Sequence, residues 1–434
     1  MRTILALIAI FSCNALFAQP LTSEGCEPTR SELLAYPTAE EATKANGGNN
    51  RYYTLLNEWT HQENSLSTPF TVPFAWANRQ VFFCVESLGS AYEVWVNGEQ
   101  VAYNADGNNP CEVNITRHVK EGRNMVELRP TDPSPLSPIE SWKQEEKIAL
   151  GKCYLVSQPT MRVRDVFVEC TPPAEEGGNI TATVSVVVKS HALNPRTSRI
   201  HYELLTPTGE LAGSGYQDLT LDMRREDTVR FLASVPKVLQ WSDKLPTLYT
   251  LRLKTQHEGR YGEYMELQLG FRSVEVKEGK LVVNGIPTLL RAYDVTGSTA
   301  SSNLLARLRE LGYNALRFSA GPVPASLLKL CDIMGIYLIV QAPIDSSKCG
   351  TSRERGGNPS NDPAWLPHYL QRTENTYHAT KRYASVVAFS LARNSANGIN
   401  LYESYLNLKR FGDPRPIIYP EAAGEWNNDP LKVR

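Results

Sequence analysis

The fold is decided by the stretch LRFSAGPVPASLLKLCDIMGIYLIVQAPI, residues 316–344. Its middle part, PASLLKLCDIM, spaces apolar residues as a helix does, and Gly335 follows as a residue that closes helices. The flanking runs, LRFSA and IYLIVQAPI, are apolar segments of strand length. Strands that are apolar on both faces and alternate with helices are typical of a parallel sheet with covered faces. We therefore predict a parallel α/β unit.

The same alternation extends from about residue 279 to residue 434. Helical spacing recurs in ASSNLLARLRELG, PAWLPHYLQRTENTYHATKRY and NLYESYLNLKRFG. Strand-like segments recur in LVVNGIPTLLRAYD, SVVAFSLARN and RPIIYPE, which brings the expected strands to five. A closed eight-stranded barrel takes about 250 residues. The stretch 278–434 is too short for that, so we predict an incomplete (β/α) barrel.

The first part of the chain follows a different pattern, that of strands without helices. Apolar and polar residues alternate in QVFFCVES, AYEVWVNGEQVAY and RNMVELRP, within residues 70–169. Asn97-Gly98 predicts a tight hairpin, because both residues tolerate the positive φ angles of a type I′ turn. Trp95 in this hairpin is expected in the core. Short strands with regular turns predict an all-β sandwich, with residues 19 to about 65 as a leader that wraps onto it.

A second run of strands follows Pro172-Pro173 and Gly177-Gly178, which we interpret as a boundary. It contains ITATVSVVVKS, RIHYELLTP and LYTLRLKTQ, and about a hundred residues without helices predict an immunoglobulin-like sandwich. The predicted organisation is thus a multidomain β plus α/β chain. Its expected domains are 19–172, 173–277 and 278–434.

The first eighteen residues predict export. Arg2 supplies a positive start, Ile4–Phe11 is almost wholly apolar, and Ala18 offers a small residue for cleavage. Cys13 raises the alternative of a lipoprotein, which the adjacent Phe11 and Ser12 disfavour. The apolar run is too short for a bilayer, and no later stretch approaches a membrane span. We expect a protein that is exported after cleavage of the signal peptide 1–18.

Charge and cysteine content exclude some partners and cofactors. Lys and Arg number 45 against 46 Asp and Glu, without a basic run, so nucleic acid is not an expected partner. Of the 8 cysteines one lies in the signal peptide, and the odd remainder leaves at least one thiol unpaired. No C-x-x-C or His/Cys cluster occurs, so we expect no structural zinc, no other metal and no cofactor.

Three ordered sets of residues resemble glycoside hydrolase family 2, the group of β-galactosidases, β-glucuronidases and β-mannosidases. Residues 70–129 resemble its sugar-binding jelly roll. LGFRSVEVKEGKLVVNGIPTLLR resembles the passage from the central sandwich into the barrel. NDPAWLPHYLQRTENTYHATKRYASVVAFSLARNSANG resembles the helix and strand that carry the catalytic acid. The resemblance implies an N-terminal jelly-roll sandwich, an immunoglobulin-like sandwich and a TIM-type barrel.

The residues that the family uses for catalysis are missing from these matches. Retaining glycosidases need two carboxylates about 5–5.5 Å apart. The resemblance places the acid in SLGNESG, whereas this chain has SLARNSANG, with Ser395 at the position of the acid and Asn394 before it. A neutral hydroxyl is no general acid near pH 7. Ala320 likewise stands where the family has a histidine, and the nucleophile of the seventh strand resembles nothing in the chain.

Substitute carboxylates and remnant sugar ligands remain open. Glu421 or Glu425, after the fifth strand, could replace the missing pair, and so could Asp345 together with Glu354. For carbohydrate binding the candidates are Arg317, Asn394, Trp142 and Tyr103, the last two in loops that in the family approach the sugar.

Three functional hypotheses follow. The first is a non-catalytic carbohydrate-binding or scaffolding relative, whose implied ligands are β-linked glycans, galactosides first among them. The second is a weak or altered β-glycosidase. The third is an interaction protein, in which a second copy or a partner chain covers the open edge of the barrel.

Overall fold

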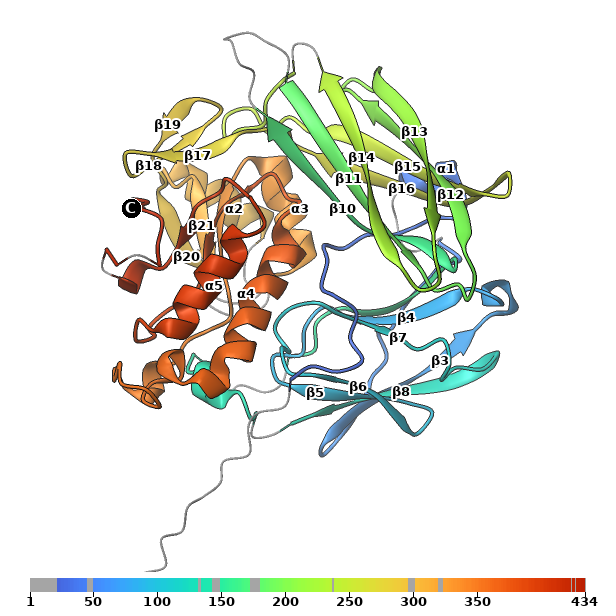
Figure 1. The fold of residues 1–434 in the computed structure, drawn as a ribbon, viewed down its shortest axis with the longest axis horizontal. Helices are drawn as coiled ribbons and strands as arrows, with labels where there is room; N and C mark the ends of the chain where they lie inside the picture. Colours follow the sequence, from blue (N-terminus) through green and yellow to red (C-terminus); the bar gives the residue numbers. More distant parts are fainter. Residues whose placement is uncertain are drawn as a thin grey trace, which may run out of the picture.

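The computed structural model describes residues 22–44, 50–131, 134–142, 149–171, 180–235, 238–295, 301–318, 323–422, 424–425 and 427–433. Two β-sandwiches stack beside an α/β unit (Figure 1). Among the described residues, no helix combines the length and apolar character that crossing a membrane requires.

The first sandwich packs a five-stranded sheet against a four-stranded sheet. In order, the larger sheet holds β2 (Thr60–Gln62), β3 (Ser65–Val72), β8 (Gly122–Pro130), β5 (Tyr92–Val96) and β6 (Glu99–Asn104). The smaller holds β1 (Tyr53–Leu55), β9 (Cys153–Gln158), β4 (Gln80–Val85) and β7 (Cys111–Asn114). These strands confirm the predicted N-terminal jelly-roll sandwich.

The β5–β6 hairpin has the predicted turn, but its tryptophan does not lie in the core as predicted. Asn97 and Gly98 have φ angles of 51° and 86°, as a tight turn between these strands requires. Val94 and Val96 are buried. Trp95 points to the opposite face of the strand, where the Arg129 guanidinium lies 3.8 Å from its ring. The expectation of a core Trp95 was wrong, because neighbouring strand residues face opposite sides.

The second sandwich pairs a three-stranded sheet with a four-stranded one. The former orders β10 (Met161–Thr171), β11 (Ile180–Ser190) and β14 (Glu226–Val235). The latter orders β13 (Leu211–Leu221), β12 (Arg196–Leu205), β15 (Tyr249–His257) and β16 (Arg260–Leu269). Since β10 pairs with β11, residues 161–171 belong to this sandwich, and the boundary falls before β10 instead of at 172. Pro172-Pro173 lies outside the described residues.

The α/β unit is a parallel sheet of five strands in the order β20 (Ala292–Val295), β21 (Ala315–Phe318), β22 (Tyr337–Gln341), β23 (Val386–Ser390) and β24 (Ile417–Ile418). Its helices are α2 (Ser302–Glu310), α3 (Ala325–Met334), α4 (Leu366–Thr380) and α5 (Ile399–Lys409). The sheet does not close, which confirms the predicted incomplete barrel. A small antiparallel sheet of β17 (Val274–Lys277), β18 (Lys280–Val283) and β19 (Ile286–Thr288) precedes it.

Gly335 ends α3 as the sequence predicts. Its φ of 69° is left-handed, and a Cβ there would lie 2.6 Å from the carbonyl oxygen of Asp243, in the segment between β14 and β15 of the second sandwich. Glycine therefore serves both the helix end and the close approach of another segment.

A segment at 427–433 reaches both edges of the open sheet. The backbone N–H of Asp429 donates to the carbonyl of Ile417 in β24 (2.8 Å), and Val433 bridges Leu290 just before β20. Leu431 and Val433 pack against the cluster of buried residues beneath the sheet. Part of the apolar surface that an incomplete barrel exposes is thus covered by the chain itself.

The N-terminal segment joins all three bodies, although the sequence predicted that it wraps onto the first. Glu24 pairs with Tyr103 in the first sandwich, and Tyr36 pairs with Tyr264 in the second. Glu32 accepts from Lys152 (2.7 Å) and from Lys329 (2.5 Å) on α3 of the barrel. Helix α1 (Ala39–Lys44) then packs beside β16.

A buried ion pair joins the first sandwich to the barrel. Residues 134–142 reach from the sandwich to the barrel, and Glu140 pairs with Arg372 of α4 at 2.5 Å, both side chains being 1% exposed. Arg372 also donates to the carbonyl of Pro343 (2.6 Å), after β22. Leu136 and Ile139 join the barrel's hydrophobic cluster. The loop is therefore part of the barrel's packing.

We expect Glu140→Ala to destabilise the protein by about 3–5 kcal/mol, because it leaves the buried Arg372 guanidinium with only the more distant Asp106 carboxylate, 3.9 Å from its Nε. Urea unfolding measures the loss. Glu40→Ala is the matched control, since it removes an exposed ion pair to Lys44 within α1 and should leave the unfolding midpoint unchanged. Equal midpoints for the two variants would contradict the structural role of Glu140.

A buried carboxyl between the sandwiches makes stability depend on pH. Glu263 of β16 is fully buried; its Oε1 accepts from Gln158 Nε2 (3.1 Å), while its Oε2 has no hydrogen-bond partner in the part of the chain that the structure describes. Burial raises the pKa of Glu263 to about 7. The folded state therefore keeps a proton that the unfolded state loses from about pH 4.5 upward, and this group's contribution to stability falls as pH rises towards 7.

Glu263→Gln should remove that dependence and raise the free energy of unfolding above pH 7 by up to about 3 kcal/mol, at about 1.4 kcal/mol per pKa unit. Unfolding midpoints at pH 5 and pH 8 test this. Glu210→Gln, at an exposed turn, is the control, and its unfolding midpoint should change between pH 5 and pH 8 as that of the wild type does. If the midpoint of Glu263→Gln also changes with pH as the wild type does, Glu263 does not titrate in this window.

Candidate functional site at the carboxyl ends of the barrel strands

Several of the predicted site residues lie at one edge of the parallel sheet, because all five strands end there. Asp294 and Arg317 lie at the ends of β20 and β21, Asp345 follows β22, and Asn394 follows β23. Glu421 lies after β24, in the short 3-10 helix Pro420–Ala422. The edge carries mostly carboxylates, with one guanidinium and one amide between them.

The hydroxyl of Ser395 is engaged in backbone hydrogen bonds. Its Oγ accepts from the backbone N–H of Ser346 (3.1 Å) and donates to the carbonyl of Arg393 (3.1 Å). The residue is 6% exposed, and its own carbonyl accepts from the Tyr419 hydroxyl. The side chain at the position of the expected acid thus ties two loops together and offers no acidic proton.

Asn394 lies between two carboxylates. Its φ of 48° is in the left-handed region, where asparagine is among the better tolerated side chains. The backbone N–H donates to Glu421 Oε1 (3.3 Å), and the side-chain amide donates to Asp345 Oδ2 (3.1 Å). The structure therefore brings Asp345 and Glu421 to either side of one residue, a pairing that sequence reasoning missed.

The two carboxylates sit in different surroundings. Asp345 is 4% exposed, and its backbone pairs with Glu140 on one side and with Arg393 on the other. Glu421 is exposed at the rim. Glu354, the partner that the sequence offered for Asp345, lies in an exposed loop at 351–357, and no hydrogen bond among the described residues joins the two.

Arg317 and Asp294 form a bidentate ion pair. The guanidinium donates from Nε (2.7 Å) and from Nη2 (2.9 Å) to the two carboxylate oxygens. These hydrogen bonds lower the pKa of Asp294 and raise that of Arg317, to which Glu421 adds an attraction. The sequence did not indicate Asp294 as a site residue. Asp294 is identified by the register of β20 and β21, which places it directly opposite Arg317.

Glu425 is held away from this group by a separate clamp. Arg353 donates to both of its carboxylate oxygens at 2.8 Å, and the Asn397 amide donates at 3.0 Å. The hydrogen bonds from Arg353 lower the pKa of Glu425. It is therefore ionised near neutral pH, which disfavours it as a substitute acid.

The two aromatic candidates differ in accessibility. Trp142 is half-buried and follows Ser141, whose backbone N–H donates to the carbonyl of Asp345 (2.8 Å), so it lies near the rim of the site. Tyr103 lies in strand β6, not in a loop as the sequence predicted, and is 9% exposed. It packs in the same cluster as Leu136 of the docked loop. Tyr103 thus contributes to the junction between domains.

Chemically, the site offers hydrogen-bond partners of both kinds. Arg317 has five N–H groups, of which two are used by Asp294, and the Asn394 amide adds another donor. Asp294, Asp345 and Glu421 supply acceptors. Among the described residues, no group of three His, Cys, Asp or Glu side chains is arranged to hold a metal ion.

Family models match each body of the structure. The model described as Glycosyl hydrolases family 2, sugar binding domain, matches residues 58–140. Glycosyl hydrolases family 2 matches residues 161–272, and Glycosyl hydrolases family 2, TIM barrel domain, matches residues 274–431.

Similar proteins are longer than this chain. β-Galactosidase of Psychromonas ingrahamii is 27% identical over 368 residues, and that of Priestia megaterium is 25% identical over 373. Each alignment covers 81% of this chain and 35% of the relative, so the chain spans about a third of their length.

Solved structures share the fold at low sequence identity. A Bacteroides uniformis β-glucuronidase 2 superposes with a TM-score of 0.69 at 15% identity, over 92% of this chain and 52% of that one. A β-D-glucuronidase of Dictyoglomus thermophilum superposes with a TM-score of 0.66 at 18% identity, over 92% and 73%. With three consecutive family models on three consecutive bodies, the chain belongs to glycosyl hydrolase family 2.

Proposed function

We propose that this glycosidase-like protein is exported and binds a β-linked glycan at the carboxyl ends of its barrel strands without hydrolysing it. The observation that carries the proposal is Ser395. A neutral hydroxyl that is 6% exposed and bonded to two backbone groups replaces the general acid that glycoside hydrolysis requires.

Binding is supported by the groups around Ser395. Arg317 and Asn394 present donors, and Asp294 and Glu421 present acceptors, on one exposed edge, while the buried Asp345 holds the Asn394 amide. A sugar ring offers hydroxyls that both donate and accept, so such a mixed edge suits it. Similar proteins are named β-galactosidases, β-glucuronidases and an exo-β-D-glucosaminidase. Galactosides are our first choice, because the β-galactosidase of Psychromonas ingrahamii is 27% identical to this chain over 368 residues.

One observation favours a second candidate, a weak or altered β-glycosidase. Asp345 and Glu421 both contact Asn394, so two carboxylates flank a single residue of the active edge. Glycosidases of both stereochemical types use such pairs. A third candidate, a barrel completed by a partner chain or a second copy, depends on how much of the sheet edge the segment 427–433 leaves free.

Hydrolysis of aryl β-galactosides and β-glucuronides separates the first two candidates. We expect no turnover above buffer for the chain lacking residues 1–18, and none for Ser395→Glu, since restoring the acid does not supply the nucleophile of the family's seventh strand, which resembles nothing in the chain. The affinity for lactose and β-1,4-galactobiose should fall about tenfold in Arg317→Ala, which corresponds to about 1.4 kcal/mol. Arg353→Ala, which removes only the ion pair between Arg353 and Glu425, is the matched control and should bind as the wild type does.

Turnover by the natural sequence would overturn the non-catalytic proposal. In that case Asp345→Asn and Glu421→Gln should each abolish it, whereas Glu425→Gln should not. Equal glycan affinities of Arg317→Ala and the wild type would contradict binding at the barrel edge, whatever the outcome of the hydrolysis assay.

Export is supported by the charged start, apolar run and small residue within positions 1–18. N-terminal sequencing of the chain recovered from outside producing cells tests this part of the proposal. Cleavage after Ala18 leaves Gln19 as the first residue, and a chain retained in the cytoplasm with Met1 intact would contradict export.

A further inference from the structure

The outer face of the β13–β12–β15–β16 sheet carries a row of aromatic side chains. His201 of β12 lies opposite Tyr216 of β13 on one side and opposite Lys254 of β15 on the other. Lys254 in turn lies opposite Tyr264 of β16. Their strand neighbours Tyr202, Leu253 and Met265 point into the core of the sandwich. The row therefore faces away from the core, across all four strands.

The rings of this row are close to one another; Tyr216 and Tyr261 are open to solvent, and His201 and Tyr264 are half-buried. His201 lies 5.6 Å from Tyr216 and 6.1 Å from Tyr261, between ring centroids, and Tyr261 lies 5.8 Å from Tyr264. Tyr216 is 59% exposed and Tyr261 is 49% exposed. Neighbouring exposed rings on a domain surface mark a binding surface more often than isolated ones do. We call Tyr216, His201, Tyr261 and Tyr264 the aromatic row.

Charged side chains beside the aromatic row neutralise one another. Arg199 lies over the Tyr216 ring at 4.3 Å and pairs with Asp218 at 2.7 Å. Lys254 lies 5.5 Å from the Tyr261 centroid and pairs with Glu203 at 3.3 Å. Matched charges create no net field to attract a polyanion. The surface consequently favours an uncharged ligand that still forms hydrogen bonds.

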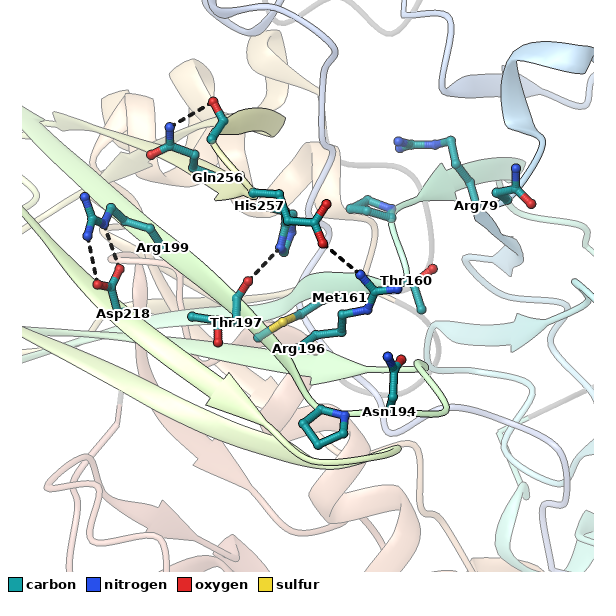
Figure 2. A pocket seen from close by; sticks show the side chains of 15 residues that line it. Arg79, Thr160, Met161, Asn194, Arg196, Thr197, Arg199, Asp218, Gln256 and His257 are labelled. Atoms are coloured by element: carbon teal, nitrogen blue, oxygen red, sulfur yellow. Dashed lines mark hydrogen bonds and ion pairs between the residues drawn. The ribbon is translucent and has the colours of Figure 1, made fainter.

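The aromatic row connects two hollows. A cavity of about 230 Å³ lies between the sheet and α1, and His201, Lys254 and Tyr264 form part of its wall. A larger hollow of about 930 Å³ lies at the junction of the two sandwiches. Figure 2 shows the Arg199–Asp218 pair and Gln256 at this larger hollow. Gln256 Oε1 lies 3.4 Å from His201 Nε2, so the row continues into it.

We propose that the aromatic row and its two hollows bind a single chain of a neutral oligosaccharide. Sugar rings have an apolar face of C–H groups, which packs on tyrosine rings, and hydroxyls, which bond to flanking charged groups. Ring planes here are tilted by 44–59° to their neighbours. A flat crystalline polysaccharide would need coplanar rings, so the tilt favours an isolated soluble chain. The surface lies on another domain than the barrel edge and does not depend on it.

Titration of the chain lacking residues 1–18 with cellotetraose and β-1,4-galactotetraose, followed by calorimetry and ligand-observed NMR, tests the proposal. The double variant Tyr216→Ala/Tyr261→Ala should lose at least tenfold in affinity for the tetrasaccharide it binds best. Tyr216→Phe/Tyr261→Phe should keep its affinity within about threefold, because the stacking surface remains. Phe74→Ala is the matched control, since it removes a ring that is 75% exposed on the first sandwich.

The outcomes separate this surface from the barrel edge and from other occupants. Binding that survives Arg317→Ala but not the double tyrosine variant supports the aromatic row, even if the barrel edge binds nothing. Unchanged affinity in the double variant overturns the proposal, and so does tighter binding of tetragalacturonate than of the neutral chains. If no saccharide binds and sedimentation shows self-association that the double variant abolishes, the surface joins two copies instead.

Discussion

The geometry of the barrel edge depends on the buried pair of Glu140 and Arg372. Burying two charges is costly, and such pairs are better evidence for a specified arrangement than for stability. Here the arrangement is the packing of residues 134–142 against the barrel. The backbone of Glu140 forms a β-bridge with that of Asp345, whose backbone forms a second bridge with that of Arg393. The position of Asp345, and through it the contact with the Asn394 amide, follows from where the first sandwich docks. The candidate site is thus a property of two domains together.

Periodicity along the chain was sufficient to predict the elements, because burial imposes it directly. Apolar runs in β22 and β23 and the glycine after α3 correctly indicated a covered parallel sheet. The same reasoning misplaced the first domain boundary. Proline and glycine after residue 171 occur between two strands of one sheet, β10 and β11, and local sequence does not tell whether the strands on either side of such residues belong to one domain or to two. Trp95 was misassigned for a related reason: its face follows from strand alternation, not from the apolar residues beside it.

At the site, sequence indicated which residues lie at the strand ends but not which of them meet. Ser395, Asn394 and Arg317 are located there because parallel strands share one carboxyl edge. The Arg317–Asp294 pair needs the register of β20 and β21, and the contacts of Asn394 need its left-handed backbone. Tyr103 was expected near the sugar, and only the packing of the first sandwich on the barrel reveals that it is buried. These features depend on contacts between segments far apart in sequence.

In the proposed function, the missing acid and the binding edge share one structural basis. Ser395 is short enough to bond the backbone of Ser346 and of Arg393, so its hydroxyl is held between two loops. Asn394, one residue earlier, then presents its amide between Asp345 and Glu421. Carboxylate oxygens accept hydrogen bonds from sugar hydroxyls, whereas the Ser395 hydroxyl is not acidic enough to protonate a leaving oxygen near pH 7. These contacts support the proposal of an edge that recognises a sugar but lacks the proton that hydrolysis requires.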